Sequence, residues 1–440
     1  MKKVKVIINL ILISGLLLYK PILAQRIVNE RIIRKVADRI LDETSYEFIN
    51  TKTGEKYKSL KNVKITPEVK VESKYNDWHY TNGVLHIAMI ELSKTLNEKK
   101  YKEFVEKNFE FVFKNVKYFD PLYKKTLRED GDKWLKVRSI NWHMFFRMIR
   151  LDDYGTMAAS LLEVPDCMNN KNYRVYIQKA IDHLMNVETR LDDRTISRLW
   201  PHEKTIWADD LYMSVSLLAR AGYYLDNNKY FDEAINQVIS FDNYLWDDVK
   251  KLYYHCYYTD TKTNGVAHWA RANGWIMMAI TDLLTYLPEN NPQRDKVIRI
   301  FNKQAEGIAR YQSETGLWHQ LLDKEDSYLE TSASCMFIFC LARGVNKGWL
   351  IEDFAYVAEM GWRGVLSKVD EDGNIHDICV GTGIMPSLVF YYKRPTQVNI
   401  PMGEGPFLRA GAEILKMKRY RPEPARTKYD KIIKEAGVAK

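Results

Sequence analysis

Two adjacent acids, Asp209 and Asp210, follow a tryptophan at the point where a helical pattern begins. The apolar residues after them recur at i, i+4 and i+7, the spacing of one helix face. Acids at a helix start often do no more than cap free N–H groups and meet the positive end of the helix dipole. A second pair, Asp152 and Asp153, lies upstream. Because two carboxylates held close together cannot both ionise cheaply, one of them can keep its proton and act as a general acid.

Aromatic rings recur near the same kind of loop-to-helix junction. Trp78 and Tyr80 precede one helical run, and Trp207 precedes the second acidic pair. Arg271 and Trp275 are four residues apart and therefore lie on one face of a helix. Flat aromatic faces combined with carboxylates suit a sugar, because apolar C–H faces stack on the rings while the acids reach hydroxyl groups.

Arg271 and His255 are further candidates for this site. The planar fork of an arginine fits a carboxylate, although a structural arginine at a loop–helix junction is the alternative. His255 lies in the run Leu252–Tyr258, one of the few strand-like stretches. Such a histidine is more often packed than catalytic, but its aromatic neighbours place it near the other candidates. Two further acidic pairs, at 192–193 and 247–248, are interpreted as solvated turns.

Helical patterns dominate the elements that must position these residues. Helices are expected at 25–41, 100–116, 142–150, 157–164, 173–187, 230–245, 295–310 and 351–365. Further helices follow the candidate junctions and a last one opens at Gly403–Pro406, whereas 46–72 is expected to be irregular. The junctions at Trp78, Asp153, Asp209, Arg271, Thr331 and Gly383 are 75, 56, 62, 60 and 52 residues apart. Each unit is long enough for two helices.

Six helical hairpins predict an all-α fold that closes into an (α/α)6 barrel. The inner helices of such a ring bring their N-terminal loops to one end, so the candidate residues would share one cleft. The alternative is an open helical solenoid. We expect one domain over residues 25–440.

Bulk composition narrows the class of protein. The chain has 440 residues, of which 46% are hydrophobic, enough for a large core. Residues 1–24 have a charged start, an apolar stretch and a small residue at the end, which predicts a secretory signal peptide and a periplasmic or secreted protein without a membrane anchor after cleavage. Its removal takes away four lysines and lowers the net charge from +9 to +5. Charges of both signs are interspersed, so no nucleic-acid partner is expected. The five cysteines match no zinc pattern, and most are expected to be buried thiols.

Three motifs resemble those of glycoside hydrolase family 105, the unsaturated rhamnogalacturonyl hydrolases, which are related to the unsaturated glucuronyl hydrolases of family 88. They are Trp207–Met213 (WADDLYM), Trp269–Trp275 (WARANGW) and Tyr328–Ala333 (YLETSA). The resemblance extends from about Trp78 to about Leu415. It implies an (α/α)6 barrel that acts, without a metal or another cofactor, on oligosaccharides ending in a uronic acid with a C4=C5 double bond.

The resemblance also implies a role for each candidate. Asp209 would be the acid/base that protonates C4 and then activates water for attack on C5, with Asp210 as the helix cap. Asp153 would be the second acid, although the local spacing leaves Asp152 open. The substrate-binding residues would be Trp207, His255, Arg271, Trp275, Trp78 and Tyr80. Ala272 replaces a glycine that many family members carry.

Three other classes of protein remain open at this point. One is a non-catalytic carbohydrate-binding protein on the same barrel, and another is a helical scaffold for protein partners. The third is a polysaccharide lyase or an ordinary glycosidase of similar fold. The sequence does not identify the sugar next to the unsaturated uronate.

Overall fold

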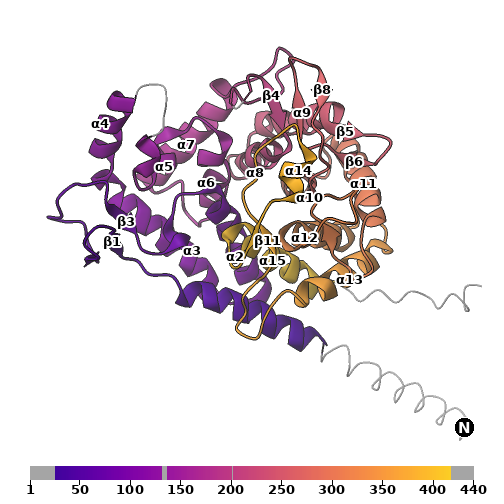
Figure 1. Cartoon of the computed structure of the whole chain (residues 1–440), viewed down its shortest axis with the longest axis horizontal. Coiled ribbons are helices and arrows are strands. Elements are labelled where there is room, and N and C mark those ends of the chain that lie inside the picture. The colour runs from indigo at the N-terminus through magenta and orange to yellow at the C-terminus, as the bar shows by residue number, and fades with distance from the viewer. Residues whose placement is uncertain (1–24, 131–135, 201, 418–440) are drawn as a thin grey trace, which may run out of the picture.

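The computed structural model describes residues 25–130, 136–200 and 202–417. Within them, a ring of six inner helices organises the fold (Figure 1). The inner helices are α2 (Tyr80–Leu96), α6 (Leu151–Leu162), α8 (Ala208–Tyr224), α10 (Ala270–Tyr286), α12 (Thr331–Asn346) and α15 (Pro401–Lys416). Each one contacts the next, and α15 returns to α2, so the ring closes. The expected (α/α)6 barrel is therefore confirmed, and the open solenoid is excluded.

The inner helices are apolar on nearly all sides. Almost every residue of α10 from Ala270 to Leu284 is buried, and α12 is equally enclosed. A helix that is hydrophobic all round belongs in the interior of a large protein. The ring therefore forms the core of the molecule.

The outer helices are amphipathic and each covers the inner helix that precedes it. They are α3 (Lys99–Asn115), α7 (Lys171–Asn186), α9 (Asn228–Leu245), α11 (Arg294–Arg310) and α13 (Phe354–Leu366). In α11, Val297, Ile300, Phe301 and Ile308 are buried on one face while charged residues occupy the other.

The sixth outer position is filled from the beginning of the described chain. The helix at residues 25–42 lies along α15, where Ile33 packs against Gly411 and Arg39 forms an ion pair with Glu404 (Figure 1). The helix expected at 25–41 is thus confirmed.

Short strands lie between the helices. They are β1 (Phe48–Asn50), β2 (Lys56–Tyr57), β3 (Val69–Val71), β4 (Thr205–Trp207), β5 (Trp246–Asp247), β6 (Leu252–Tyr253), β7 (Cys256–Tyr258), β8 (Thr263–Asn264), β9 (Trp318–His319), β10 (Leu329–Glu330), β11 (Ile378–Cys379) and β12 (Thr396–Gln397). All pairings are antiparallel, and β4 and β10 lead directly into α8 and α12. The remaining elements are η1 (Lys74–Asn76), η2 (Val116–Tyr118), α4 (Asp120–Asp130), η4 (Lys136–Ser139), α5 (His143–Arg147) and α14 (Leu388–Tyr392).

Three local predictions were wrong. Residues 46–72 were expected to be irregular but contribute the small sheet β2-β1-β3. The helix expected at 142–150 is only the short α5, because Trp142 and Met148 adopt left-handed backbone angles on either side of it. The sixth inner helix does not begin near Gly383. Pro386 disfavours helical backbone in the residue before it, and the helix begins instead at Pro401.

Several expectations concern parts that the structure does not describe or does not test. The predicted signal peptide lies outside the described residues, and the localisation stays a prediction. Among the described helices, none is both long and apolar enough to cross a membrane. All five cysteines are buried free thiols.

Candidate active site

Asp209 lies in the first turn of α8 at the N-terminal end of the inner ring. The preceding strand β4 pairs with β7, and the N–H of Ala208 donates to the carbonyl of His255, which fixes the two segments side by side. The Nε2 atom of His255 is 3.1 Å from Oδ2 of Asp209, and its Nδ1 is 2.9 Å from the hydroxyl of Tyr391. The His255 side chain is fully buried, whereas that of Asp209 is 15% exposed. Asp209 is therefore the member of this pair that a substrate can reach.

The electrostatic surroundings of Asp209 favour its ionised form. Burial raises the pKa of Asp209, but the hydrogen bond with His255 and the positive charges of His255, Arg198 and Arg271 outweigh burial and leave the pKa below its ordinary value. The carboxylate is thus a strong acceptor that needs an additional negative charge nearby before it can hold a proton at neutral pH.

Arg198 connects two more carboxylates to this site. Its Nε and Nη2 atoms each donate to Asp210 at 2.7 Å, and its Nη1 atom is 3.3 Å from Asp152. The guanidinium also lies over the ring of Trp207, with 4.3 Å between Cζ and the ring centroid. Burial raises the pKa of Asp210 to about 6, against the opposing effect of Arg198 and with the help of Asp152 and Asp209. One guanidinium is thus shared by two carboxylates.

Asp153 has a different environment from its neighbour Asp152. Its carboxylate is fully buried and forms a two-point ion pair with Arg147, in which Nε donates to Oδ2 at 2.9 Å. The N–H groups of Ile149 and Arg150 also donate to Oδ2. No hydrogen bond or ion pair joins Asp153 to Asp209 or to Arg198. The structure therefore places Asp153 in the start of α6 and brings Asp152, which is 20% exposed, toward the site through Arg198.

Arg271 lies at the start of α10 and binds the segment after β11. Its Nη1 and Nη2 atoms donate to the carbonyls of Cys379 and Val380, both at 2.6 Å, and Nη1 is 3.3 Å from the hydroxyl of Ser332. Its guanidinium stacks on Trp269 at 4.4 Å. These contacts hold the guanidinium rigidly. An arginine has five N–H donors, and among the described residues none accepts from Nε or from the second hydrogen of Nη2.

The four candidate aromatic residues differ in what they offer a ligand. Tyr80 is half-buried, and its pKa is raised by burial and then by the nearby charge of Asp152. Trp207 is 7% exposed and contacts His255 edge to face at 5.9 Å. Trp275 is 1% exposed and stacks on Tyr212 at 5.0 Å, below Tyr80.

Trp78 belongs to the core. It is 1% exposed, its indole N–H donates to the carbonyl of Asp153 and to the hydroxyl of Tyr176, and its ring meets Phe145 and Tyr176 at 4.8 and 4.9 Å. Its ring faces are covered by protein, so the structure does not present it to a sugar.

Three residues of the site escaped the sequence analysis. Arg198 lies in none of the recognised motifs, and its backbone bridge to Thr205 of β4 places it beside the acids. Tyr391 lies 136 positions from the histidine that it contacts. Glu330 was within a recognised motif, and it caps α12 while accepting the N–H of Cys379 at 2.9 Å, so it supports the segment that Arg271 binds. In the described residues, no group of three or more His, Cys, Asp or Glu side chains is arranged to hold a metal ion.

A closed (α/α)6 ring with acids, arginines and aromatic rings at one end defines a carbohydrate-active type of protein. Residues 54–418 match the model of Glycosyl Hydrolase Family 88, and the chain belongs to this family. The family-level resemblance of the three motifs is thereby confirmed.

Curated relatives carry more specific names. The chain is 30% identical over 215 residues to the unsaturated rhamnogalacturonyl hydrolase YesR of Bacillus subtilis, covering 48% of this chain and 60% of that protein. It is 32% identical over 176 residues to an unsaturated 3S-rhamnoglycuronyl hydrolase of Alteromonas sp., covering 39% and 43%. The chain thus spans about half the length of these relatives.

Solved structures share the fold. A protein from Salmonella enterica, described as a possible member of the GH105 family, superimposes with a TM-score of 0.70 at 24% identity, covering 89% of this chain and 94% of that one. The unsaturated glucuronyl hydrolase of Bacillus sp. GL1 gives a TM-score of 0.58 at 16% identity, covering 87% and 95%.

Proposed function

We propose that the protein is a hydrolase that removes a terminal 4,5-unsaturated uronic acid from oligosaccharides produced by polysaccharide lyases. The observation that carries the proposal is the position of Asp209, which is partly exposed, hydrogen-bonded to His255 and flanked by Arg198 and Arg271. The names of the curated relatives support the same reaction class.

The proposed reaction adds water across a vinyl ether. Asp209 gives its proton to C4 of the uronate, and the resulting cation is centred on C5 and the ring oxygen. The Asp209 carboxylate then takes a proton from a water molecule whose oxygen bonds to C5. The hemiketal so formed opens and releases the next sugar, and Asp209 has recovered its proton. Such acid/base assistance contributes about 10²- to 10⁴-fold to a rate.

Substrate binding supplies the charge that Asp209 needs. The uronate carboxylate would accept from the two free N–H groups of Arg271, in the geometry that a guanidinium favours. Placing this anion between Arg271 and Asp209 cancels the positive potential that lowers the pKa of Asp209. The acid therefore gains its proton when the substrate binds, which couples recognition of the uronate to catalysis.

We assign the part of the second acid to Asp152 rather than to Asp153. Asp152 is paired with Arg198, is 20% exposed and affects Tyr80, whereas Asp153 is fully occupied by Arg147 and backbone N–H groups. Tyr80 and Trp207 would contact the sugar, and Trp275 would form the floor below Tyr80.

The test follows the ultraviolet absorbance of the conjugated double bond while purified protein is added to lyase-digested pectin, glycosaminoglycan or algal oligosaccharides. We expect absorbance to fall with one substrate class, and Asp209→Asn to reduce that rate about 10²- to 10⁴-fold without unfolding the protein. Asp152→Asn should reduce the rate, whereas Asp153→Asn should mainly lower the melting temperature.

Other outcomes would point to other functions. Retained turnover in Asp209→Asn would remove it as the acid/base. A rise in absorbance with intact polymer would indicate a lyase. This fold does include one, since a structure described as a polysaccharide lyase superimposes with a TM-score of 0.61 at 18% identity. No change with any substrate would favour a non-catalytic carbohydrate-binding protein.

A further inference from the structure

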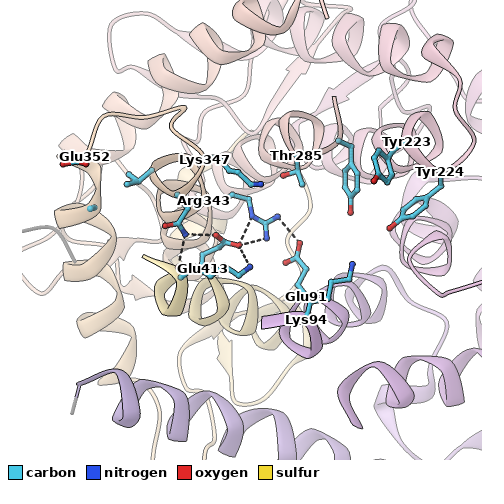
Figure 2. A pocket seen from close by; sticks show the side chains of 14 residues that line it. Glu91, Lys94, Tyr223, Tyr224, Thr285, Arg343, Lys347, Glu352 and Glu413 are labelled. Carbon is cyan, nitrogen blue, oxygen red and sulfur yellow. Dashed lines mark hydrogen bonds and ion pairs between the residues drawn. The ribbon is translucent and has the colours of Figure 1, made fainter. Parts of the chain in front are cut away.

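A cavity of about 830 Å³ lies at the end of the barrel opposite Asp209 (Figure 2). It is lined by the last turns of α2, α8, α10, α12 and α15. Asp209 and Tyr223 are both in α8 and are 14 residues apart, so the rise of a helix separates the two places by roughly 21 Å. The volume falls in the range of about 300–1,000 Å³ that is usual for ligand pockets. This cavity is therefore distinct from the candidate active site.

One wall of the cavity is a cluster of three tyrosines. The ring of Tyr223 is 5.1 Å from that of Tyr224 and 5.4 Å from that of Tyr286. Tyr223 is 59% exposed and Tyr224 is 40% exposed, although both belong to α8, whose preceding turns are buried. Tyr224 and Tyr286 both donate hydrogen bonds to Glu163, which fixes their rings. Rigid, exposed aromatic faces next to polar groups are suited to stacking on the C–H face of a sugar.

The floor of the cavity consists of charged side chains that form ion pairs with one another. Arg343 donates to Glu91 at 3.0 Å and to Glu413 at 2.8 Å, as Figure 2 shows. Glu413 also accepts from Asn346 at 2.9 Å and from Lys416 at 3.0 Å. The carboxylates of the floor are thus satisfied by protein cations and do not repel an anion as free carboxylates would.

Above this floor the exposed lining residues Lys347 and Glu352 carry opposite charges. Of the four cationic side chains in the lining, Lys94 pairs with Glu163, which lies outside the lining. Lys347, directly after α12, is exposed and has no ion pair with any described residue. The last carbonyl groups of the inner helices also face this end, and they can accept hydrogen bonds from hydroxyl groups. A ligand that matches the whole surface needs an apolar face, several hydroxyls and a carboxylate.

We infer that this cavity is a second carbohydrate-binding site, which holds a segment of an acidic oligosaccharide. Tyr223 would stack on one sugar, and Lys347 would pair with a uronate carboxylate. The choice of an acidic saccharide rests on the proposed function, whereas the location of the site rests on the cavity alone. A site of this kind would keep the enzyme on the polymer while Asp209 acts on chain ends elsewhere.

Calorimetric titration of the full protein with saturated trigalacturonate tests this inference, because the probe lacks the double bond on which Asp209 acts. We expect binding by the wild type and by Arg271→Ala, and at least about 10-fold weaker binding by Tyr223→Ala, the usual scale for loss of a stacking contact of about 1.4 kcal/mol. Tyr356→Ala is the matched control, because Tyr356 is a 51% exposed tyrosine outside the cavity lining. Lys347→Ala should weaken binding of trigalacturonate but leave that of the neutral probe maltotriose unchanged.

The results separate this site from the proposed function. Binding that is lost in Arg271→Ala and kept in Tyr223→Ala would overturn the inference, because the probe would then occupy the candidate active site. Absence of binding by the wild type up to roughly 10 mM would also overturn it. Turnover of an unsaturated disaccharide is measured on the same sample. Binding without turnover counts against the proposed function alone, and turnover without binding counts against the second site alone.

Discussion

The two ends of the barrel hold similar sets of buried acids and arginines but balance them differently. At the N-terminal end of the inner helices, Arg198 is shared by Asp210 and Asp152, with Asp209 nearby. In the centre and toward the other end, three arginines and four carboxylates alternate in one network, and two lysines complete it. The network consists of Arg220, Arg343, Arg409, Glu91, Glu163, Asp282, Glu413, Lys94 and Lys416.

The difference in balance appears in the pKa values. Burial raises the pKa of Asp282, but Arg409 and Arg220 outweigh it and the pKa falls below its ordinary value. Burial also raises the pKa of Glu91, but Arg343 and Arg409 outweigh burial and hold the pKa well below its ordinary value. At Asp210 the effect of burial is larger than that of Arg198, and the pKa rises to about 6. Similar burial thus leaves fixed charges where cations outweigh it, in the central network and at Asp209, and raises the pKa where they do not, at Asp210.

The largest effect on stability is expected from breaking the balanced network. Arg409→Met removes the ion pairs of Arg409 with the buried carboxylates Glu91 and Asp282. It should lower the free energy of unfolding by about 3–5 kcal/mol. Chemical denaturation monitored by circular dichroism measures this. Arg363→Met, at an exposed position on α13, is the control and should change stability by less than about 0.5 kcal/mol. A similar loss in both variants would show that the network has no special role.

A pH-dependent effect is expected from Glu188, which belongs to the poorly balanced end. Burial raises its pKa from 4.5 to about 7, although Tyr154 donates a hydrogen bond to it. The folded state therefore binds the proton more tightly than the unfolded state. The stabilisation is present below about pH 4.5 and is lost as pH rises through 7. Glu188→Gln should match the wild type in acid and be more stable above pH 7, by up to about 3 kcal/mol.

Melting temperatures of both proteins between pH 4 and pH 8 measure this difference. Glu413→Gln is a useful contrast, because Arg343 and Lys416 overcome burial and lower the pKa of Glu413. Glu413→Gln should therefore lower the melting temperature at neutral pH, and the difference from the wild type should become smaller in acid. The same pH trend in both variants would contradict the distinction between the two ends.

The smallest effect should be a displacement of the pH–rate profile. Asp210→Asn removes one carboxylate from Arg198, so the positive charge of Arg198 acts more strongly on Asp209 and lowers its pKa further. The rate should then decline at lower pH than in the wild type, with about 10-fold less activity at neutral pH for each pH unit of displacement. The pH dependence of kcat/KM measures it. An unchanged profile with a uniformly lower rate would mean that Asp210 only holds Arg198 in place, since no capping hydrogen bond joins its carboxylate to α8.

Sequence patterns were sufficient for the ring and for part of the site. The inner helices are long apolar runs, and the acids and aromatic residues before them occur in recognisable motifs, so Asp209, His255 and Arg271 were found correctly as neighbours. The sequence could not decide between Asp152 and Asp153, because consecutive residues at a helix start point in different directions. In the structure, Arg147 forms a buried ion pair with Asp153, whereas Asp152 pairs with Arg198 beside the site.

The sequence analysis did not predict the central network of arginines and carboxylates, although the positions of its residues in the sequence follow a pattern. Arg220, Asp282 and Arg343 each appear as a lone charge in an apolar run. Glu163, Arg220, Asp282, Arg343 and Glu413 all lie twelve positions after the first residue of their inner helix, and Glu91 lies eleven after Tyr80. Once the helix starts are known, this equal height predicts a charged layer. Without them, the partners are tens to hundreds of residues apart and no local pattern relates them.

The closure of the ring has a consequence for how the chain assembles. Each of the first five inner helices packs on the outer helix that follows it, and these hairpins can form locally during synthesis. The seam between α15 and α2 is different, since Arg409 of α15 and Glu91 of α2 meet across 318 positions. Because closing so long a loop costs conformational entropy, this contact is expected to form late in folding. Until then the apolar flanks of the first and last hairpins stay uncovered, so a ribosome that stalls before residue 401 would release an open, aggregation-prone arc rather than a smaller working enzyme.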